Sequence, residues 1–544
     1  METYLPNTPD VHLSDHDLRQ LDDAVLANLT PEQARSLLSK AIEDLKNARE
    51  RLAQNPTNSS RPPSTRAPWE QAEAQGREPE EGSAGAGQGA ESGCSESESE
   101  SESESESEQK KPAKSSKGKG TEKPAGRAGR RQGAPGHSRT QRLPVDAEQA
   151  HQPQSCAICG GALDDSHRSR AHNAHYVLEL VPPAGGGHGL VVQQTKHIYF
   201  ETLCPCGHWS RELPGRCEAQ DSWSVKLSES HLAGPTLVAF ICALTQRMRL
   251  SRAKVREFLS DWLGLSLSTA LINQCVHEAA RAVEPVVEQE ILTTVRDVEL
   301  AYADETSWKE HGKLLWLWVF TCATATFFIV GRRTREMVQQ VLGESFRGWL
   351  MSDGYWVYRE FDQRLRCLPH IIRKARALEE GFDAEGGEFG RHVLDVIATV
   401  MQAVYDARGG PPQSELRKRH APTLAALLKH CLRLADCRHE KTRALARELL
   451  NDWDTFWVVL DHPELPLSNN EAERALRHWV IARRIGMGTR TPQGTRAFAL
   501  LASVIETCRK RGVSPWPYLA EVVRQRRKGL PAPLMPAPVA AAAA

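Results

Sequence analysis

The stretch AYADETSW, residues 301–308, decides the fold class of this chain. Val298, Leu300 and Tyr302 recur at every second residue and would lie on one face, and this period of two predicts a β-strand over 298–303. The strand is expected to end just before Asp304. A carboxylate at a strand end can face a cleft while the strand holds it in position, so Asp304 is a candidate for chemistry.

Two further acids occur in similar settings downstream. Asp353, in LMSDGYWVY, follows an apolar segment expected to be a strand, and Gly354 permits a sharp exit from it. Glu473, in PLSNNEAERALR, is expected on the first turns of a helix. Each acid alone is compatible with an ordinary solvated turn or strand end. Together, two strand-end aspartates and a helical glutamate form an arrangement that holds two divalent cations.

Such a pair of cations predicts phosphoryl transfer. Hard carboxylate oxygens suit Mg²⁺, with Mn²⁺ as a substitute, and the two ions of a catalytic pair sit roughly 3.5–4 Å apart. One ion activates the attacking oxygen, and the other stabilises the leaving oxygen of the scissile phosphate. The predicted catalytic residues are therefore Asp304, Asp353 and Glu473.

A multidomain α/β protein is predicted from the pattern around these acids. Aromatic and β-branched residues indicate a β-hairpin over 314–330, and residues 383–460 are expected to be mostly helical. The other expected elements are a helix over 334–342, strands over 348–354 and 365–369, and a final helical region over 468–527.

Two close cysteine pairs predict a small zinc-binding domain over 150–215. The first pair is a CxxC followed by two glycines, and the second is a CxC with a histidine two residues on. Tetrahedral Zn²⁺ takes four sulfur or nitrogen ligands at such spacings; the alternative is a set of unligated thiols. The predicted ligands are Cys156, Cys159, Cys204 and either Cys206 or His208. Cys367 and His370 form a further pair that lacks a partner pair, so they are expected to pack in the core.

The segment over 14–54 is expected to be helical. Leu38, Leu45 and Leu52 recur every seven residues and form a short a/d seam with alanines between them. Two interpretations stay open: an amphipathic helix that packs on its own protein, or a coiled coil that self-associates.

Residues 55–148 are predicted to be a disordered linker, because their composition cannot bury a core. A Ser-Glu repeat, Ser95–Glu108, is uniformly acidic. Lys110–Arg142 holds eleven Lys or Arg and one acid, and it is interpreted as a flexible arm that neutralises DNA phosphates rather than as a solubilising tail. The cations assigned to DNA in this arm include Lys110, Lys111, Arg127, Arg130 and Arg131.

Two features closer to the acids also indicate DNA. Within a helical region over 230–292, LSRAKVREFLSDWLGLSLSTALINQCV resembles a helix-turn-helix, although helix pairs of this kind are common in any bundle. Arg474 and Arg477 lie beside Glu473, where they would contact DNA phosphates or pair with acids of the fold.

Composition narrows the class of protein. The 544 residues exceed one ordinary core and imply several domains. Lys plus Arg equals Asp plus Glu at 69 each, but the acidic and basic blocks are segregated. No apolar run reaches the ~18 residues of a membrane span, and the N-terminus lacks a signal region, so a soluble cytosolic chain is expected. The thirteen scattered cysteines indicate reduced thiols. The segment over 528–544 is expected to be a disordered tail.

These motifs resemble those of the DDE transposases of the insertion sequence 66 family. The resemblance extends over about residues 30 to 525. It rests on ADETSW, SDGYWVY, CLPHIIRKARALEEG and NNEAERALRHWVIARRIG in that order, and on NPTNSSRPPS, GRRQGAPGHSR, the cysteine pairs and TPQGTRAFALLASVIETCRKRGVSPWPYL. It implies an RNase H-like catalytic domain over 295–527, interrupted by a helical insertion at about 383–460.

The resemblance also bears on individual residues. Its catalytic acids correspond to Asp304, Asp353 and Glu473, and an acid directly before Arg474 selects Glu473 over the nearby Glu471. The family has a zinc-binding domain at the cysteine pairs but more usually shows CxxC in the second pair. The CxC of this chain departs from that pattern and leaves the fourth ligand open.

The resemblance implies a transposase that binds the terminal inverted repeats of an insertion sequence. It would cleave the DNA strands at the element ends and join the 3′-OH ends to target DNA. A homo-oligomer on DNA is expected, with accessory proteins of the same element, in the bacterial cytoplasm at the nucleoid. Two alternatives stay open: a catalytically silent DNA-binding protein derived from a transposase, and a structure-selective nuclease of the same fold.

Overall fold

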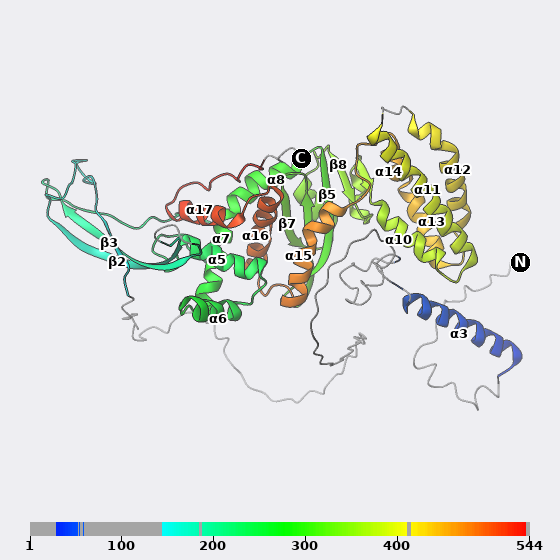
Figure 1. Cartoon of the computed structure of the whole chain (residues 1–544), viewed down its shortest axis with the longest axis horizontal. Helices are drawn as coiled ribbons and strands as arrows, with labels where there is room; N and C mark the ends of the chain where they lie inside the picture. The colour runs from blue at the N-terminus through cyan, green and yellow to red at the C-terminus, as the bar shows by residue number, and fades with distance from the viewer. Residues whose placement is uncertain are drawn as a thin grey trace, which may run out of the picture. The chain divides into compact units, whose positions relative to one another are not determined.

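The computed structural model describes residues 29–52, 54, 58, 144–183, 188–410 and 415–539 (Figure 1). Most of the linker predicted over 55–148 lies outside the described residues, including the acidic repeat and the basic arm Lys110–Arg142. No helix of the described part combines the length and apolar character needed to cross a membrane.

The N-terminal helix α3 spans Pro31–Leu52. The earlier part of the predicted helix, residues 14–28, lies outside the described residues. The Glu50 carboxylate forms an ion pair with Lys441 on a distant helix. The seam leucines are exposed at Leu38, Leu45 and Leu52.

A four-stranded sheet carries the cysteine pairs in the loops after its first and third strands. Its strands are β1 (Ala147–His151), β2 (Ser169–Val181), β3 (Val191–Leu203) and β4 (Trp209–Arg211). The third strand is central: it pairs antiparallel with β2 and β4 and parallel with β1. β1 begins within the segment expected to be linker, because its backbone pairs with β3.

Helices occupy the chain between this sheet and the next. They are α5 (Pro235–Cys242), η2 (Ala243–Arg247), α6 (Arg252–Leu263), α7 (Thr269–Val286), η3 (Val287–Ile291) and α8 (Leu292–Arg296). α6 and α7 coincide with the predicted helix pair. Gly264 ends α6 with a φ of 65°, and the hydroxyls of Ser251 and Ser268 cap the two helices.

A five-stranded sheet carries Asp304 on its first strand, and Asp353 directly follows the end of its fourth strand. Its strands are β5 (Leu300–Glu310), β6 (Lys313–Thr321), β7 (Thr326–Gly331), β8 (Trp349–Ser352) and β9 (Arg364–Arg366). The order is β7-β6-β5-β8-β9. The first three strands form an antiparallel meander, whereas β5, β8 and β9 are parallel. The β6–β7 pair is the hairpin predicted over 314–330.

The expectation that a strand ends just before Asp304 is wrong. β5 continues through Asp304 to Glu310, because that part of the strand pairs with β6 in the meander. The neighbour β8 ends at Ser352, so Asp304 lies beside the point at which the parallel pairing stops. A second strand is also shorter than predicted: β9 ends at Arg366, because Pro369 belongs to the first turn of the following helix.

A helical insertion follows β9 and has its own apolar core. Its elements are α10 (Leu368–Glu379), α11 (Ala384–Gly409), α12 (Leu416–Leu434), α13 (Glu440–Asn451), α14 (Trp453–Trp457) and η5 (Val458–Leu460). Two shorter helices precede β9: α9 (Arg335–Leu342), close to the predicted 334–342, and η4 (Trp356–Glu360).

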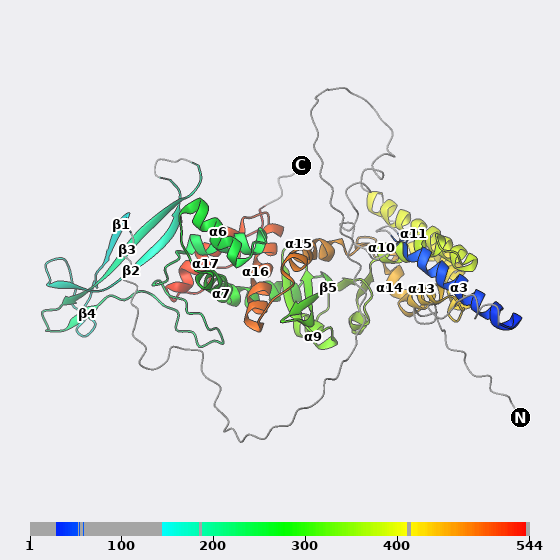
Figure 2. The ribbon, with the colours of Figure 1, turned by 90° about the horizontal axis from the view of Figure 1, so that it is seen from below.

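Three helices complete the described chain: α15 (Asn470–Gly486), α16 (Pro492–Lys510) and α17 (Pro515–Arg527). Helices α15 and α16 lie along the five-stranded sheet in both views (Figures 1 and 2). The side chains of Ser503 and Thr507 accept hydrogen bonds from the backbone of β7, which anchors α16 to the sheet.

The disordered tail expected over 528–544 is wrong for residues 528–539. The Met535 side chain is buried in the main core, and its backbone N–H donates to Glu290 at 2.8 Å. The Tyr518 hydroxyl donates to the backbone of Pro533 at 2.9 Å. Proline and alanine suggest a chain without regular structure, but an extended segment can still be held by side chains from other elements. Residues 540–544 lie outside the described part.

Candidate active site

Asp304 and Asp353 lie beside each other where the β5–β8 pairing ends. In the parallel register, Tyr302 lies opposite Met351, and each aspartate follows two residues later. Side chains two residues apart on a strand point to the same face, and neighbouring strands lie roughly 4.8 Å apart. The register therefore brings these two carboxylates together.

Glu473 brings a third carboxylate to the same region from the first turn of α15. Burial raises the pKa of Glu473, Arg373 opposes this shift, and the charge of Asp353 adds to it. Burial also raises the pKa of Asp304 well above its usual range, together with the charges of Asp353, Glu305 and Glu473. The acids thus repel one another, a situation that a bound divalent cation relieves.

Asn469 fixes the start of α15 against the sheet. Its side-chain amide donates to the backbone carbonyl of Ala303 at 2.8 Å, directly before Asp304. Its backbone N–H donates to the sulfur of Cys367 at 3.2 Å. Asn469 is fully buried, so these contacts set the position of Glu473 relative to Asp304.

The turn after β8 orients Asp353. One carboxylate oxygen accepts a hydrogen bond from the Tyr355 backbone N–H at 2.9 Å. Gly354, between them, has a φ of 125°, which disfavours a side chain. The guanidinium of Arg366 also fills the space that a Cβ on Gly354 would occupy. Arg366 in turn donates to Asp452 at 2.8 Å from the helical insertion.

A buried acid beside the site was not predicted from the sequence. The Glu305 carboxylate accepts hydrogen bonds from the Arg333 guanidinium at 2.6 and 3.0 Å and from the Tyr358 hydroxyl at 2.7 Å. Burial and the charge of Asp353 raise its pKa, although these hydrogen bonds oppose the shift. The sequence does contain a signal for this residue: Glu305 is an acid directly after Asp304 in a strand. Because side chains alternate along a strand, Glu305 points to the opposite face of the sheet from Asp304.

Cys367 and His370 lie beside Glu473. Their ligand atoms and that of Glu473 are all within 4.8 Å of one another. One Glu473 oxygen and the Nδ1 of His370 are buried and have no hydrogen-bond partner among the described residues. Cys367 is fully buried in a core cluster, in keeping with the packing role expected from the sequence. The nearby guanidinium of Arg373 is 3.8 Å from Glu473.

The neighbouring charges on α15 have other partners. Glu471 forms ion pairs with Lys510 at 2.9 Å and with Arg474 at 3.1 Å, which turn it away from the two aspartates. Arg477 is exposed and forms no ion pair within the described part of the chain. This geometry favours Glu473 over Glu471 as the third acid.

A known family spans these elements. Residues 230–497 match the transposase IS66 family, and the matched segment contains all three acids and the helical insertion. This segment belongs to the IS66 transposase family. The segment begins after the cysteine-bearing sheet, so the acids, rather than the cysteines, lie in the part shared with the family.

Three similar proteins come from Sinorhizobium fredii (strain NBRC 101917 / NGR234), and all are named as uncharacterized. The protein y4jD is 23% identical over 406 residues, which cover 68% of this chain and 74% of the relative. The protein y4jO is 30% identical over 171 residues, 30% of this chain and 46% of the relative. The protein y4qI is 23% identical over 346 residues, 56% of this chain and 62% of the relative.

Outside the matched segment, four cysteines come together in the loops of the first sheet. The sulfur of Cys156 is 3.6 Å from that of Cys206, and the sulfur of Cys159 is 3.5 Å from that of Cys204. All four sulfurs lie within 4.8 Å of one another, and His208 is not part of the group. This geometry favours Cys206 over His208 as the fourth donor of a metal site.

The thiols differ in their acidity. Backbone N–H groups of Cys159 and Ile158 lower the pKa of Cys156 to about 5. The backbone N–H of Cys206 likewise lowers the pKa of Cys204. Burial and the neighbouring sulfurs outweigh this effect, and they raise the pKa of Cys204 to about 12. The hydrogen bonds to Cys156 stabilise a thiolate, which is the form that binds metal.

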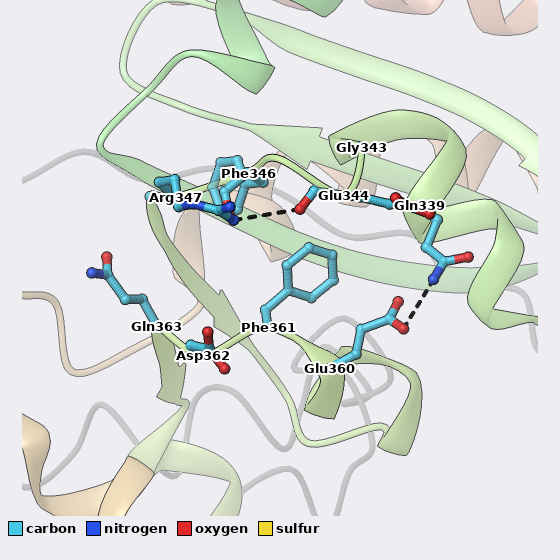
Figure 3. A pocket seen from close by; sticks show the side chains of 10 residues that line it. Gln339, Gly343, Glu344, Phe346, Arg347, Glu360, Phe361, Asp362 and Gln363 are labelled. Carbon is cyan, nitrogen blue, oxygen red and sulfur yellow. Dashed lines mark hydrogen bonds between the residues drawn. The ribbon is translucent and has the colours of Figure 1, made fainter.

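A pocket of about 290 Å³ lies elsewhere on the five-stranded sheet (Figure 3). Its lining includes Arg347 and Gly348 just before β8 and Gln363 just before β9. It therefore lies at the amino ends of the parallel strands, whereas Asp353 follows the carboxyl end of β8. Ligands of parallel sheets bind outside the carboxyl ends of the strands, so this pocket is separate from the acid site.

Proposed function

We propose that the chain is a metal-dependent transposase that cleaves DNA strands at the ends of an insertion sequence and joins the 3′-OH ends to target DNA. The observation that carries this proposal is the register that sets Asp304 beside Asp353, with Glu473 converging from α15. Membership of the IS66 family supplies the class of reaction.

The donor atoms fit a pair of divalent cations. Carboxylate oxygens are the ligands that Mg²⁺ and Mn²⁺ prefer, and one buried Glu473 oxygen accepts no hydrogen bond from the described residues. Asp304, Asp353 and Glu473 would hold the ions. When bound, such ions activate the attacking oxygen and stabilise the leaving oxygen of a phosphodiester.

The protein's own residues prepare this arrangement. Asn469 ties the Glu473 helix to the Asp304 strand, and the Tyr355 backbone N–H fixes the orientation of Asp353. Arg333 and Tyr358 hold Glu305 on the other side of the strand, which keeps its carboxylate from joining the acid cluster. Rigid elements therefore set the geometry before DNA binds.

An RNase H-like catalytic domain over 295–527 is part of the proposal. A meander followed by two parallel strands, with acids on the first strand and after the fourth, supports it. The insertion over 383–460 separates the second acid from the third, and its apolar cluster packs against the sheet through Met351 of β8 and Leu365 of β9.

We infer in addition that the four cysteines hold one structural Zn²⁺. Four sulfurs within 4.8 Å of one another, from two loops of one sheet, are the donor set of a closed tetrahedral site. The domain over 150–215 would then depend on zinc for its loop structure. DNA at the element ends and at the target is the proposed partner, engaged by a homo-oligomer.

Strand cleavage of a labelled element-end duplex tests the proposal. The full chain should nick the duplex in the presence of Mg²⁺ and transfer the new 3′-OH end to a second duplex. A catalytically silent descendant would bind without nicking, and a structure-selective nuclease would nick without transfer. Either result would replace the transposase assignment.

A further inference from the structure

A groove of about 530 Å³ lies between the helix pair α6–α7 and the loop that joins α15 to α16. Its charged lining consists of cations only: Arg249, Arg252 and Arg490, with no Asp or Glu among the lining residues. The rest of the polar lining comes from hydroxyl, amide and imidazole groups such as those of Ser251, Asn273, His277 and Thr491. The lining therefore offers hydrogen-bond donors and positive charge to an anion.

The three arginines lack counter-ions in the described part of the chain. Arg252 is half-buried, and its Nε donates a hydrogen bond to the neutral amide oxygen of Asn273 at 3.4 Å. Burial lowers the pKa of Arg252. Arg249 donates to the imidazole of His478 at 2.8 Å, and its Nε is buried without a partner. A cation withdrawn from water without an acid is costly, so such sites favour an anionic ligand.

Backbone features add to this preference. Ser251 and Thr491 are the N-caps of α6 and α16, so two helix N-termini border the groove. Helix N-termini attract phosphate through free N–H groups and the helix dipole. Arg249 also has a φ of 60°, a conformation unusual for a residue with a side chain and often kept at functional sites.

The loop that carries Arg490 is held firmly in position. The Thr489 backbone accepts from His311 and donates to Lys309, each at 2.9 Å, and the Thr489 hydroxyl accepts from Trp308 at 3.1 Å. Gly488 approaches the Lys309 carbonyl so closely that a Cβ could not be accommodated. The groove therefore joins the end of β5, the strand of Asp304, to the predicted helix pair.

We propose that this groove binds the sugar–phosphate backbone of duplex DNA at the element end, with Arg252 and Arg490 each engaging a phosphate. The volume exceeds that of a single phosphate, and the cations come from two separate elements, as expected for successive charges along a strand. The inference rests on the proposed function, since it names the surface by which the same enzyme holds its substrate. Backbone contacts position a duplex without reading its sequence.

Fluorescence anisotropy of the full chain on a labelled element-end duplex, at several salt concentrations, tests the groove. Arg252→Gln and Arg490→Ala should each weaken binding, and the double variant should weaken it more. Each lost phosphate contact should reduce the slope of log affinity against log salt by about 0.9. Arg438→Ala is a matched control, because Arg438 is an exposed arginine of the helical insertion and its side chain has no hydrogen-bond or ion-pair partner among the described residues.

The results of these measurements distinguish a failure of the groove inference from a failure of the proposed transposase activity. Arg490 is exposed, so Arg490→Ala should keep the wild-type melting temperature and isolate the binding effect. The inference would be overturned if the groove variants bound with the wild-type affinity and the wild-type salt dependence. It would also be overturned if an RNA duplex of the same sequence bound more tightly than the DNA duplex through the same arginines. If the chain binds DNA through these arginines but never nicks it, the groove stands and the proposed function fails.

Discussion

The guanidinium of Arg366 fills the space in which a side chain on Gly354 would lie. Gly354 follows Asp353, and Arg366 is held by Asp452 at 2.8 Å and by Glu448 at 2.5 Å, both from the helical insertion. The side chains of Arg366 and Asp452 are 1% and 0% exposed. A buried ion pair thus connects the insertion to the turn that orients Asp353, and we interpret Arg366 as a positioning residue.

Asp452→Ala should therefore lower the free energy of unfolding by about 3–5 kcal/mol, because it removes the fully buried partner of the Arg366 guanidinium and leaves only the less buried Glu448. The paired variant Arg366→Met with Asp452→Leu should recover much of that loss. Urea denaturation measures both. Arg417→Met is the control: its ion pair with Asp461 is partly exposed, so it should cost at most about 1 kcal/mol.

A positioning role also predicts an effect on metal use. The paired variant should need a higher Mg²⁺ concentration for half-maximal nicking than the wild type, because the Asp353 turn loses its support. Gly354→Ala should show the same shift more strongly, since its Cβ would meet Arg366. An unchanged Mg²⁺ requirement in a folded paired variant would reduce Arg366 to a purely structural role.

The three acids should be individually essential. Asp304→Asn, Asp353→Asn and Glu473→Gln should each reduce nicking by more than the roughly 10- to 100-fold typical of residues that only support a metal ligand. Duplex binding should persist. Glu471→Gln is the matched control on the same helix turn, because Glu471 pairs with Lys510 and Arg474. Full nicking by Glu473→Gln, with loss in Glu471→Gln, would transfer the role to Glu471.

The cysteine group should hold one Zn²⁺ per chain, measured by elemental analysis of the purified protein. Cys206→Ser should lose the metal, since its sulfur is one of the four that converge. His208→Ala should retain it. Zinc loss in His208→Ala but not in Cys206→Ser would mean that the histidine is the fourth ligand.

The histidine beside the groove should make stability depend on pH. The pKa of His478 is lowered to about 4, mainly by burial. The hydrogen bond to the Gln246 carbonyl opposes this shift, and the positive charges of Arg247, Arg249 and Arg509 add to it. The ordinary value, 6.5, applies to the unfolded chain. As the pH falls, the imidazole is therefore protonated in the unfolded state before it is protonated in the folded state. The contribution of His478 to the free energy of unfolding is complete above about pH 6.5 and is lost as the pH falls toward 4.

His478→Gln should remove this part of the pH dependence. Urea denaturation of both proteins at about pH 7 and pH 5 measures it, and the wild type should lose more stability than the variant between the two conditions. His462→Gln is a suitable control, because His462 lies on the exposed surface near Glu464. Equal losses in wild type and His478→Gln would contradict the assignment.

Local pattern was sufficient for several elements. The β6–β7 hairpin and helices α6 and α7 follow from side-chain periodicity and from Gly264, and such signals act over a few residues. The end of β5 could not be predicted in this way. Whether the strand continues past Asp304 depends on pairing with β6, which the alternation of residues 298–303 does not contain.

The sequence by itself was sufficient to predict the three candidate acids and the cysteine pairs and to recognise the family, because each is a matter of residue type and spacing along the chain. Only the tertiary structure decided which groups meet. Arg366 pairs with an acid 86 residues away, and Asn469 reaches the Ala303 carbonyl across 166 residues. Strand register and helix packing create these contacts, and both depend on burial by elements distant in the chain, which local periodicity does not encode.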